Sequence, residues 1–96
     1  MIIIGFKKVI VNELVMFPVD KPNTYSAPIP NASKLTVSEI VEKIEYWTEQ
    51  KISKNKVVCP DNDWNRKGTR HVFITLSRDG KGQLTEQIEK VEFDLW

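Results

Sequence analysis

One helix-forming segment lies between two regions of strand-like sequence, and this arrangement restricts the chain to few folds. Thr36 and Glu39 have the spacing of a capping box, in which a hydroxyl and a carboxylate satisfy reciprocal backbone donors. Apolar residues then recur at the helical spacing, at Val37, Ile40, Val41, Ile44 and Trp47 or Thr48. The pattern predicts one amphipathic helix over about residues 36–50.

The segment before this helix is rich in β-branched and other apolar residues. Ile2, Ile4 and Phe6 fall on one side of an extended chain, which predicts a strand. Residues 12–13 fit a turn into a second short strand, and one long bent strand fits the pattern almost as well. Residues 18–33 contain four prolines, so we expect an irregular segment lying extended over apolar surface.

Strand patterns return after the helix. Residues 57–59 have the composition of a short buried strand. Residues 70–77 alternate strictly, with Val72, Ile74 and Leu76 on one face. Phe73 then belongs to the opposite face, together with the polar side chains of this segment.

The last part of the chain predicts a hairpin. Residues 79–82, with two glycines, fit a tight turn, and residues 91–95 alternate as a C-terminal strand. Leu84 and Ile88 lie out of phase with that strand, so we expect either a bulge or a short helical turn between Leu84 and Glu89.

Together these elements predict a single α+β domain over residues 1–96. We expect one helix packed on a mainly antiparallel sheet of four to five strands, a standard two-layer arrangement. The second face of the sheet must then be wet, covered by residues 18–33, or used for association. Phe73 would lie on that second face.

Composition narrows the function classes. The net charge is +1, which gives no global attraction to nucleic acid or to an anionic membrane. The single cysteine excludes an internal disulfide framework and favours a reducing, cytoplasmic setting. We find no targeting segment, no membrane-length apolar run and no metal or phosphate motif, so no membrane contact and no cofactor is expected.

The polar loop over residues 60–71 carries the strongest functional signal. Trp64 lies near its middle without apolar neighbours, so the ring either folds back onto the core or awaits a partner. Residues 51–78 hold seven basic and two acidic side chains, a local net charge of +5. Cations with interleaved aromatics are typical of single-stranded nucleic-acid binding, with Trp64 stacking on bases.

Two chemical sites are weaker interpretations. Cys59 and His71 could form a nucleophilic pair if their strands meet, but a free cysteine among valines is usually a small buried hydrophobe. Asp61 and Asp63 resemble the start of a calcium loop, but Arg66 and Val72 occupy the positions that require glycine and glutamate. Turns in a solvated loop explain these carboxylates better.

The leading hypothesis is a small non-catalytic interaction module whose partner is a protein or a second copy of itself. Tryptophan and arginine are enriched at binding hot spots, and exposed sheet edges invite pairing across a two-fold axis. The nucleic-acid binder is the alternative, and an enzyme using Cys59 and His71 is the remote one. The candidate binding residues are Trp64, Arg66, Lys67, Arg70, His71, Phe73 and Trp96.

Overall fold

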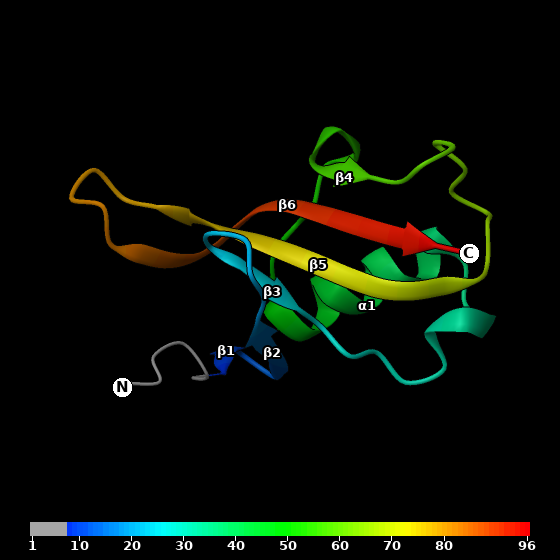
Figure 1. Ribbon diagram of the computed structural model, residues 1–96, viewed down its shortest axis with the longest axis horizontal. Helices are drawn as coiled ribbons and strands as arrows, with labels where there is room; N and C mark the ends of the chain where they lie inside the picture. The colour runs from blue at the N-terminus through cyan, green and yellow to red at the C-terminus, as the bar shows by residue number, and fades with distance from the viewer. Residues whose placement is uncertain (1–7) are drawn as a thin grey trace.

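The computed structural model describes residues 8–96 and shows one helix packed on a six-stranded sheet (Figure 1). The helix α1 spans Val37–Thr48, and two short 3-10 helices, η1 and η2, span Ala32–Lys34 and Lys54–Lys56. The strands are β1 (Val9–Val11), β2 (Leu14–Pro18), β3 (Thr24–Ser26), β4 (Val57–Val58), β5 (Thr69–Arg78) and β6 (Leu84–Leu95). The predicted α+β class is confirmed.

The strands lie in the order β1-β2-β3-β5-β6-β4, so the longest pair, β5 and β6, forms the middle of the molecule. All neighbours are antiparallel except β4, which runs parallel to β6. Val57 pairs with Val91 at that parallel edge. The sheet is therefore mixed and mostly antiparallel. No helix in the described part of the chain is long and apolar enough to cross a membrane.

The sheet has six strands, so the predicted count of four to five was too low. The additional strand is β3, which lies in the segment where irregular structure was expected. Residues 23–27 contain no proline, so their backbone donors remain available between the proline pairs. The amide of Ala27 donates to the carbonyl of Val72 at 2.9 Å, which extends the pairing of β3 with β5. Ala27 and Ile29 are buried, as expected for a chain extended over apolar surface.

At the N-terminal side, two short strands form rather than one bent strand. Val11 pairs with Leu14 across a two-residue turn. Asn12 adopts the left-handed conformation there, with φ 58°, which asparagine tolerates better than most residues. The predicted strand face of Ile2, Ile4 and Phe6 lies outside the described residues.

The capping box forms as predicted and fixes the start of α1. The amide of Glu39 donates to Thr36 Oγ1 at 3.1 Å, and the Thr36 amide donates to Glu39 Oε1 at 3.0 Å. These bonds lower the pKa of the Glu39 carboxyl, the backbone donor of Thr36 contributing most. The helix ends at Thr48, slightly before the expected end, because Glu49 adopts a left-handed conformation with φ 56°.

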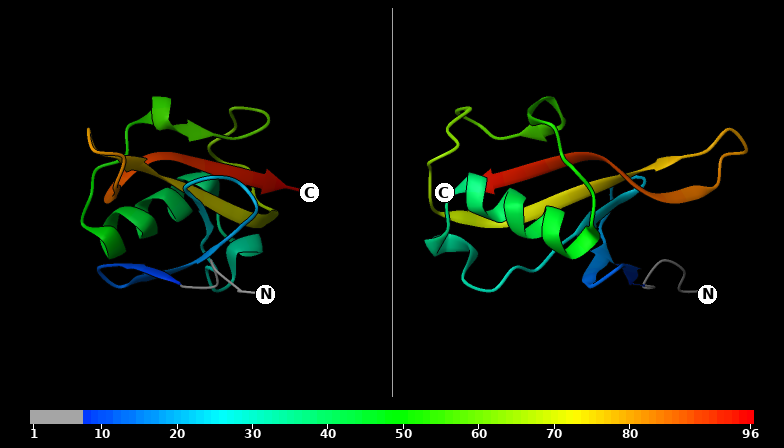
Figure 2. Two further views of the ribbon diagram at one scale, coloured as in Figure 1. Left: turned by 60° about the vertical axis from the view of Figure 1, so that its left-hand side comes forward. Right: turned by 180° about the vertical axis from the view of Figure 1, so that it is seen from behind.

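The helix covers only one face of the sheet (Figure 2). Its apolar side, including Ile40 and Ile44, packs with the predicted face of β5, where Ile74 and Leu76 are fully buried. Residues that alternate with these point away from the helix. The opposite face is therefore open over the described strands, and Phe73 belongs to it.

A β-bulge, not a helical turn, explains why Leu84 and Ile88 are out of phase with the alternation of residues 91–95. β6 is continuous, but Thr75 pairs with Lys90 while Leu76 pairs with Ile88, so Glu89 has no partner on β5. Both Ile88 and Val91 are consequently buried on the helix side. Beyond this point the β5–β6 hairpin extends away from the body as an arm (Figure 1).

Candidate functional site

The loop containing Trp64 is docked on the start of α1. The amides of Val37 and Ser38 donate to the carbonyls of Arg66 and Trp64, at 3.1 and 3.0 Å. The first amides of a helix have no partner within it, so the loop satisfies donors that would otherwise need water. The Trp64 ring is partly buried against the core, with Lys54 Nζ 5.4 Å from its centroid. Trp64 therefore holds the loop on the body.

A hydrogen bond joins Arg66 of this loop to Trp96 at the end of β6. Arg66 pairs with Asp61, and its Nη2 donates to the Trp96 carbonyl at 2.9 Å. The Trp96 side chain is 63% exposed and lies against Gly68. Lys67 is exposed beside this contact. These residues border the sheet at the end of β6, and they are separate from Phe73 on the open face.

Arg70, His71 and Phe73 come together at the start of β5, where Asp94 of β6 joins them. Arg70 Nη2 lies 2.7 Å from Asp94 Oδ1, and His71 Nδ1 lies 3.6 Å from Asp94 Oδ2. The Arg70 bond holds the pKa of the Asp94 carboxyl below its usual value, and His71 adds a smaller effect. The rings of His71 and Phe73 are 5.8 Å apart between centroids.

A second phenylalanine, Phe17, belongs to the same open face and was not a candidate on sequence. Phe17 pairs with Ser26, and Ser26 pairs with Phe73, so the three side chains form one row across β2, β3 and β5. Strand spacing places the Cα positions of the two phenylalanines about 10 Å apart, with a small serine between them. Phe17 is 46% exposed. The sequence signal that could have identified Phe17 is its alternation with Leu14 and Met16, which are buried on the other face of β2.

A hollow of about 400 Å³ adjoins this row, between β5 and residues 26–32. Its volume is within the usual range for ligand pockets, about 300–1,000 Å³. The lining combines Ser26, Ala27, Pro28, Ile29, Pro30 and Ala32 with Arg70, His71 and Val72. We call the row and this hollow together the open-face site. It contains Arg70, His71 and Phe73 of the predicted residues, but not Trp64, Arg66, Lys67 or Trp96.

The structure does not bring Cys59 and His71 together. Cys59 is buried in the core after β4, whereas His71 is exposed on the open face of β5. β6 lies between these two strands, which separates them by about 10 Å in the plane of the sheet. The nucleophilic-pair interpretation therefore has no geometric support.

The loop carboxylates act within the loop. Asp61 pairs with Arg66, and Asp63 Oδ1 accepts the amide of Asn65 at 3.0 Å, which is the expected turn. Residues 8–96 contain no group of three histidine, cysteine or acidic side chains that could hold a metal ion. Arg66 and Arg70 are both paired with carboxylates, which reduces the positive field that a nucleic-acid interface would use.

Comparisons with protein-family models, curated proteins and solved structures found no match for this chain. The site is therefore interpreted from its own chemistry.

Proposed function

We propose that the protein is a small non-catalytic binding module that associates with a protein surface through its open-face site. The observation that carries the proposal is the alignment of Phe17 and Phe73 in one cross-strand row on the sheet face that α1 leaves uncovered. An aromatic side chain gives much contact area for little conformational entropy, and such residues dominate the cores of interfaces.

The polar groups of the site fit the rim of such an interface. Arg70 and Asp94 are held in an ion pair before any partner arrives, so little further ordering is required of them. Their charges compensate each other, as do those of Lys90 and Glu92, which lie 3.5 Å apart. A face with balanced charge does not repel an identical face, which makes a second copy of the chain an acceptable partner.

The test compares two exposed aromatics on opposite sides of the molecule. Phe17→Ser removes one ring of the row, whereas Tyr46→Ser removes a ring that is 77% exposed on the outer surface of α1. Sedimentation velocity over a rising protein concentration measures self-association, and affinity capture followed by a purified binding assay measures association with another protein.

We expect association in the wild type and in Tyr46→Ser, and a loss of about tenfold or more in Phe17→Ser. The proposal is wrong if Phe17→Ser associates as well as the wild type, or if neither self-association nor a purified partner is found. A single-stranded oligonucleotide at low salt serves as the comparison ligand, and salt-sensitive binding to it would favour the nucleic-acid alternative.

A further inference from the structure

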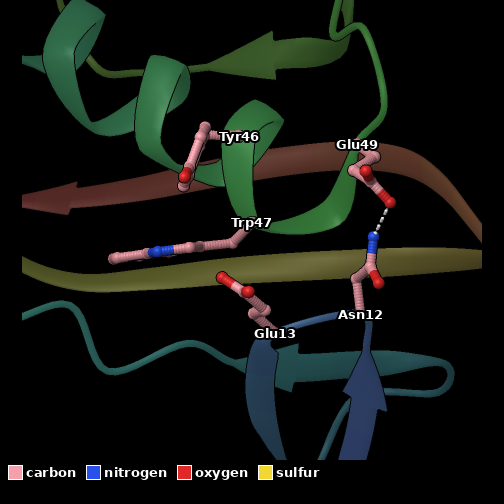
Figure 3. A pocket seen from close by; sticks show the side chains of 5 residues that line it. All are labelled: Asn12, Glu13, Tyr46, Trp47 and Glu49. Carbon is pink, nitrogen blue, oxygen red and sulfur yellow. Dashed lines mark hydrogen bonds between the residues drawn. The ribbon is translucent and has the colours of Figure 1, made fainter.

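A second hollow lies on the other side of the molecule, where the end of α1 meets the β1–β2 turn (Figure 3). Its volume is about 160 Å³, and its lining residues are Asn12, Glu13, Tyr46, Trp47 and Glu49. The volume corresponds to roughly five waters at ~30 Å³ each, well below a drug-sized pocket. It suits one small head group.

The two sides of this hollow are held together by backbone and side-chain bonds. The amide of Glu13 donates to the Trp47 carbonyl at 3.1 Å, and the Asn12 side-chain amide bonds to Glu49. Asn12 and Glu49 both adopt left-handed conformations. The turn and the helix end are therefore fixed against each other, and the Glu13 carboxylate lies beside the Trp47 ring (Figure 3).

The chemistry of the lining favours a positive charge. Two carboxylates, Glu13 and Glu49, meet the end of a helix, where the carbonyl groups already carry partial negative charge. The last turn of α1 holds no basic residue to offset them. Within the described chain, the Glu13 carboxylate has no hydrogen bond or ion pair with another residue.

The Trp47 ring adds an aromatic surface that attracts cations. Lys43 Nζ already lies 5.7 Å from its centroid, so the ring holds one cation in the structure. Lys43 lines the adjoining hollow with Glu39 and Glu42, and not the hollow at Glu13, so it leaves this one open. An aromatic ring beside carboxylates is the combination that recognises ammonium and guanidinium groups.

We propose that this hollow, lined by Glu13, Trp47 and Glu49, binds a guanidinium or alkylammonium group. Arginine or lysine side chains and small free amines share this chemistry. The binding does not depend on the open-face site, which lies on the opposite side of the sheet.

The test uses N-acetyl-arginine amide with N-acetyl-citrulline amide as its neutral isostere, and tetramethylammonium as a cation without hydrogen-bond donors. Binding is followed by NMR through the indole Nε1–H signal of Trp47, assigned by comparison with Trp47→Phe. We expect a saturable shift with both cations that weakens as salt rises, and none with the citrulline compound. A stronger response to the arginine compound would identify a guanidinium site, and a stronger response to tetramethylammonium an ammonium site.

Variants that change only the charge of exposed side chains test the effect on binding without disturbing the fold. Glu13→Gln and Glu49→Gln each remove the charge of one carboxylate at an exposed position and keep an acceptor oxygen there, and we expect each to raise the dissociation constant about two- to fivefold. Asp20→Asn removes the same charge at the far end of β2 and should bind like the wild type. Equal shifts with the arginine and citrulline compounds, or wild-type affinity in Glu13→Gln, would overturn the proposal.

Discussion

Gly68 and Trp96 contact each other closely enough that a side chain at position 68 would have to displace the Trp96 indole. The Trp96 amide donates to the Gly68 carbonyl at 3.0 Å, and a Cβ on Gly68 would lie 3.1 Å from indole Cδ1 and Nε1. Gly68 also has φ +99°, a conformation that L side chains rarely adopt. This contact ties the last described residue to the loop that holds Trp64.

Gly68→Ala should lower the free energy of unfolding by roughly 1–3 kcal/mol, because it combines backbone strain with the displaced indole. Urea unfolding measures the change. Gly82→Ala is the matched control, since Gly82 also has a positive φ, +78°, and nothing lies within 4 Å of a Cβ there. An equal effect of the two substitutions would contradict the proposed role of the Trp96 contact.

Glu49→Gly should raise the free energy of unfolding by about 0.5 kcal/mol, because the relief of backbone strain outweighs the loss of the exposed hydrogen bond from Asn12. Glu49 ends α1 in the left-handed conformation, which glycine adopts without the Cβ clash that glutamate has. The control is Glu42→Gly in the exposed interior of the helix, which should lower stability by about 1 kcal/mol. Thermal and urea unfolding should agree on the opposite signs.

Trp64→Ala should destabilise the protein by roughly 1–3 kcal/mol, less than the ~3–5 kcal/mol typical of a fully buried ring. The reason is that Trp64 packs against the core and holds the loop whose carbonyls cap α1. Tyr46→Ala, at an exposed aromatic, should stay within about 0.5 kcal/mol of the wild type. A neutral Trp64→Ala would contradict this packing role.

The capping box predicts a pH dependence at the acidic end. The folded pKa of Glu39 lies below its ordinary value of 4.5, chiefly through the backbone donor of Thr36. The ionised carboxylate therefore contributes stability above that value, and the contribution is lost as pH falls through the lower folded pKa. Urea unfolding from neutral pH downward should show a shallower loss of stability in Glu39→Gln than in the wild type. Parallel curves would contradict this linkage.

The helix and the faces of β5 were predictable because both depend on local sequence. Thr36 and Glu39 fix the start of α1 from positions three residues apart, and the alternation around Ile74 assigns the buried face of β5 without reference to the rest of the chain. Periodicity within one segment can be recognised without knowing which other segment packs against it. The same holds for the turn at Asn12, whose side chain suits its conformation.

The strand β3 and the open-face site required the tertiary structure. Three residues between prolines carry almost no periodic signal, and β3 exists because β2 and β5 supply partners on both of its sides. Trp64 has nothing apolar near it in sequence, and its packing partners come from elsewhere in the fold.

The sequence by itself therefore determined the α+β class, the helix and which residues of each long strand face the core. Only the tertiary structure decided that Phe17 and Phe73 share one row, that Cys59 and His71 are separated, and that Glu13 meets the end of α1. The physical reason is that strand pairing joins residues far apart in the chain, and the pattern within one strand does not specify its neighbour.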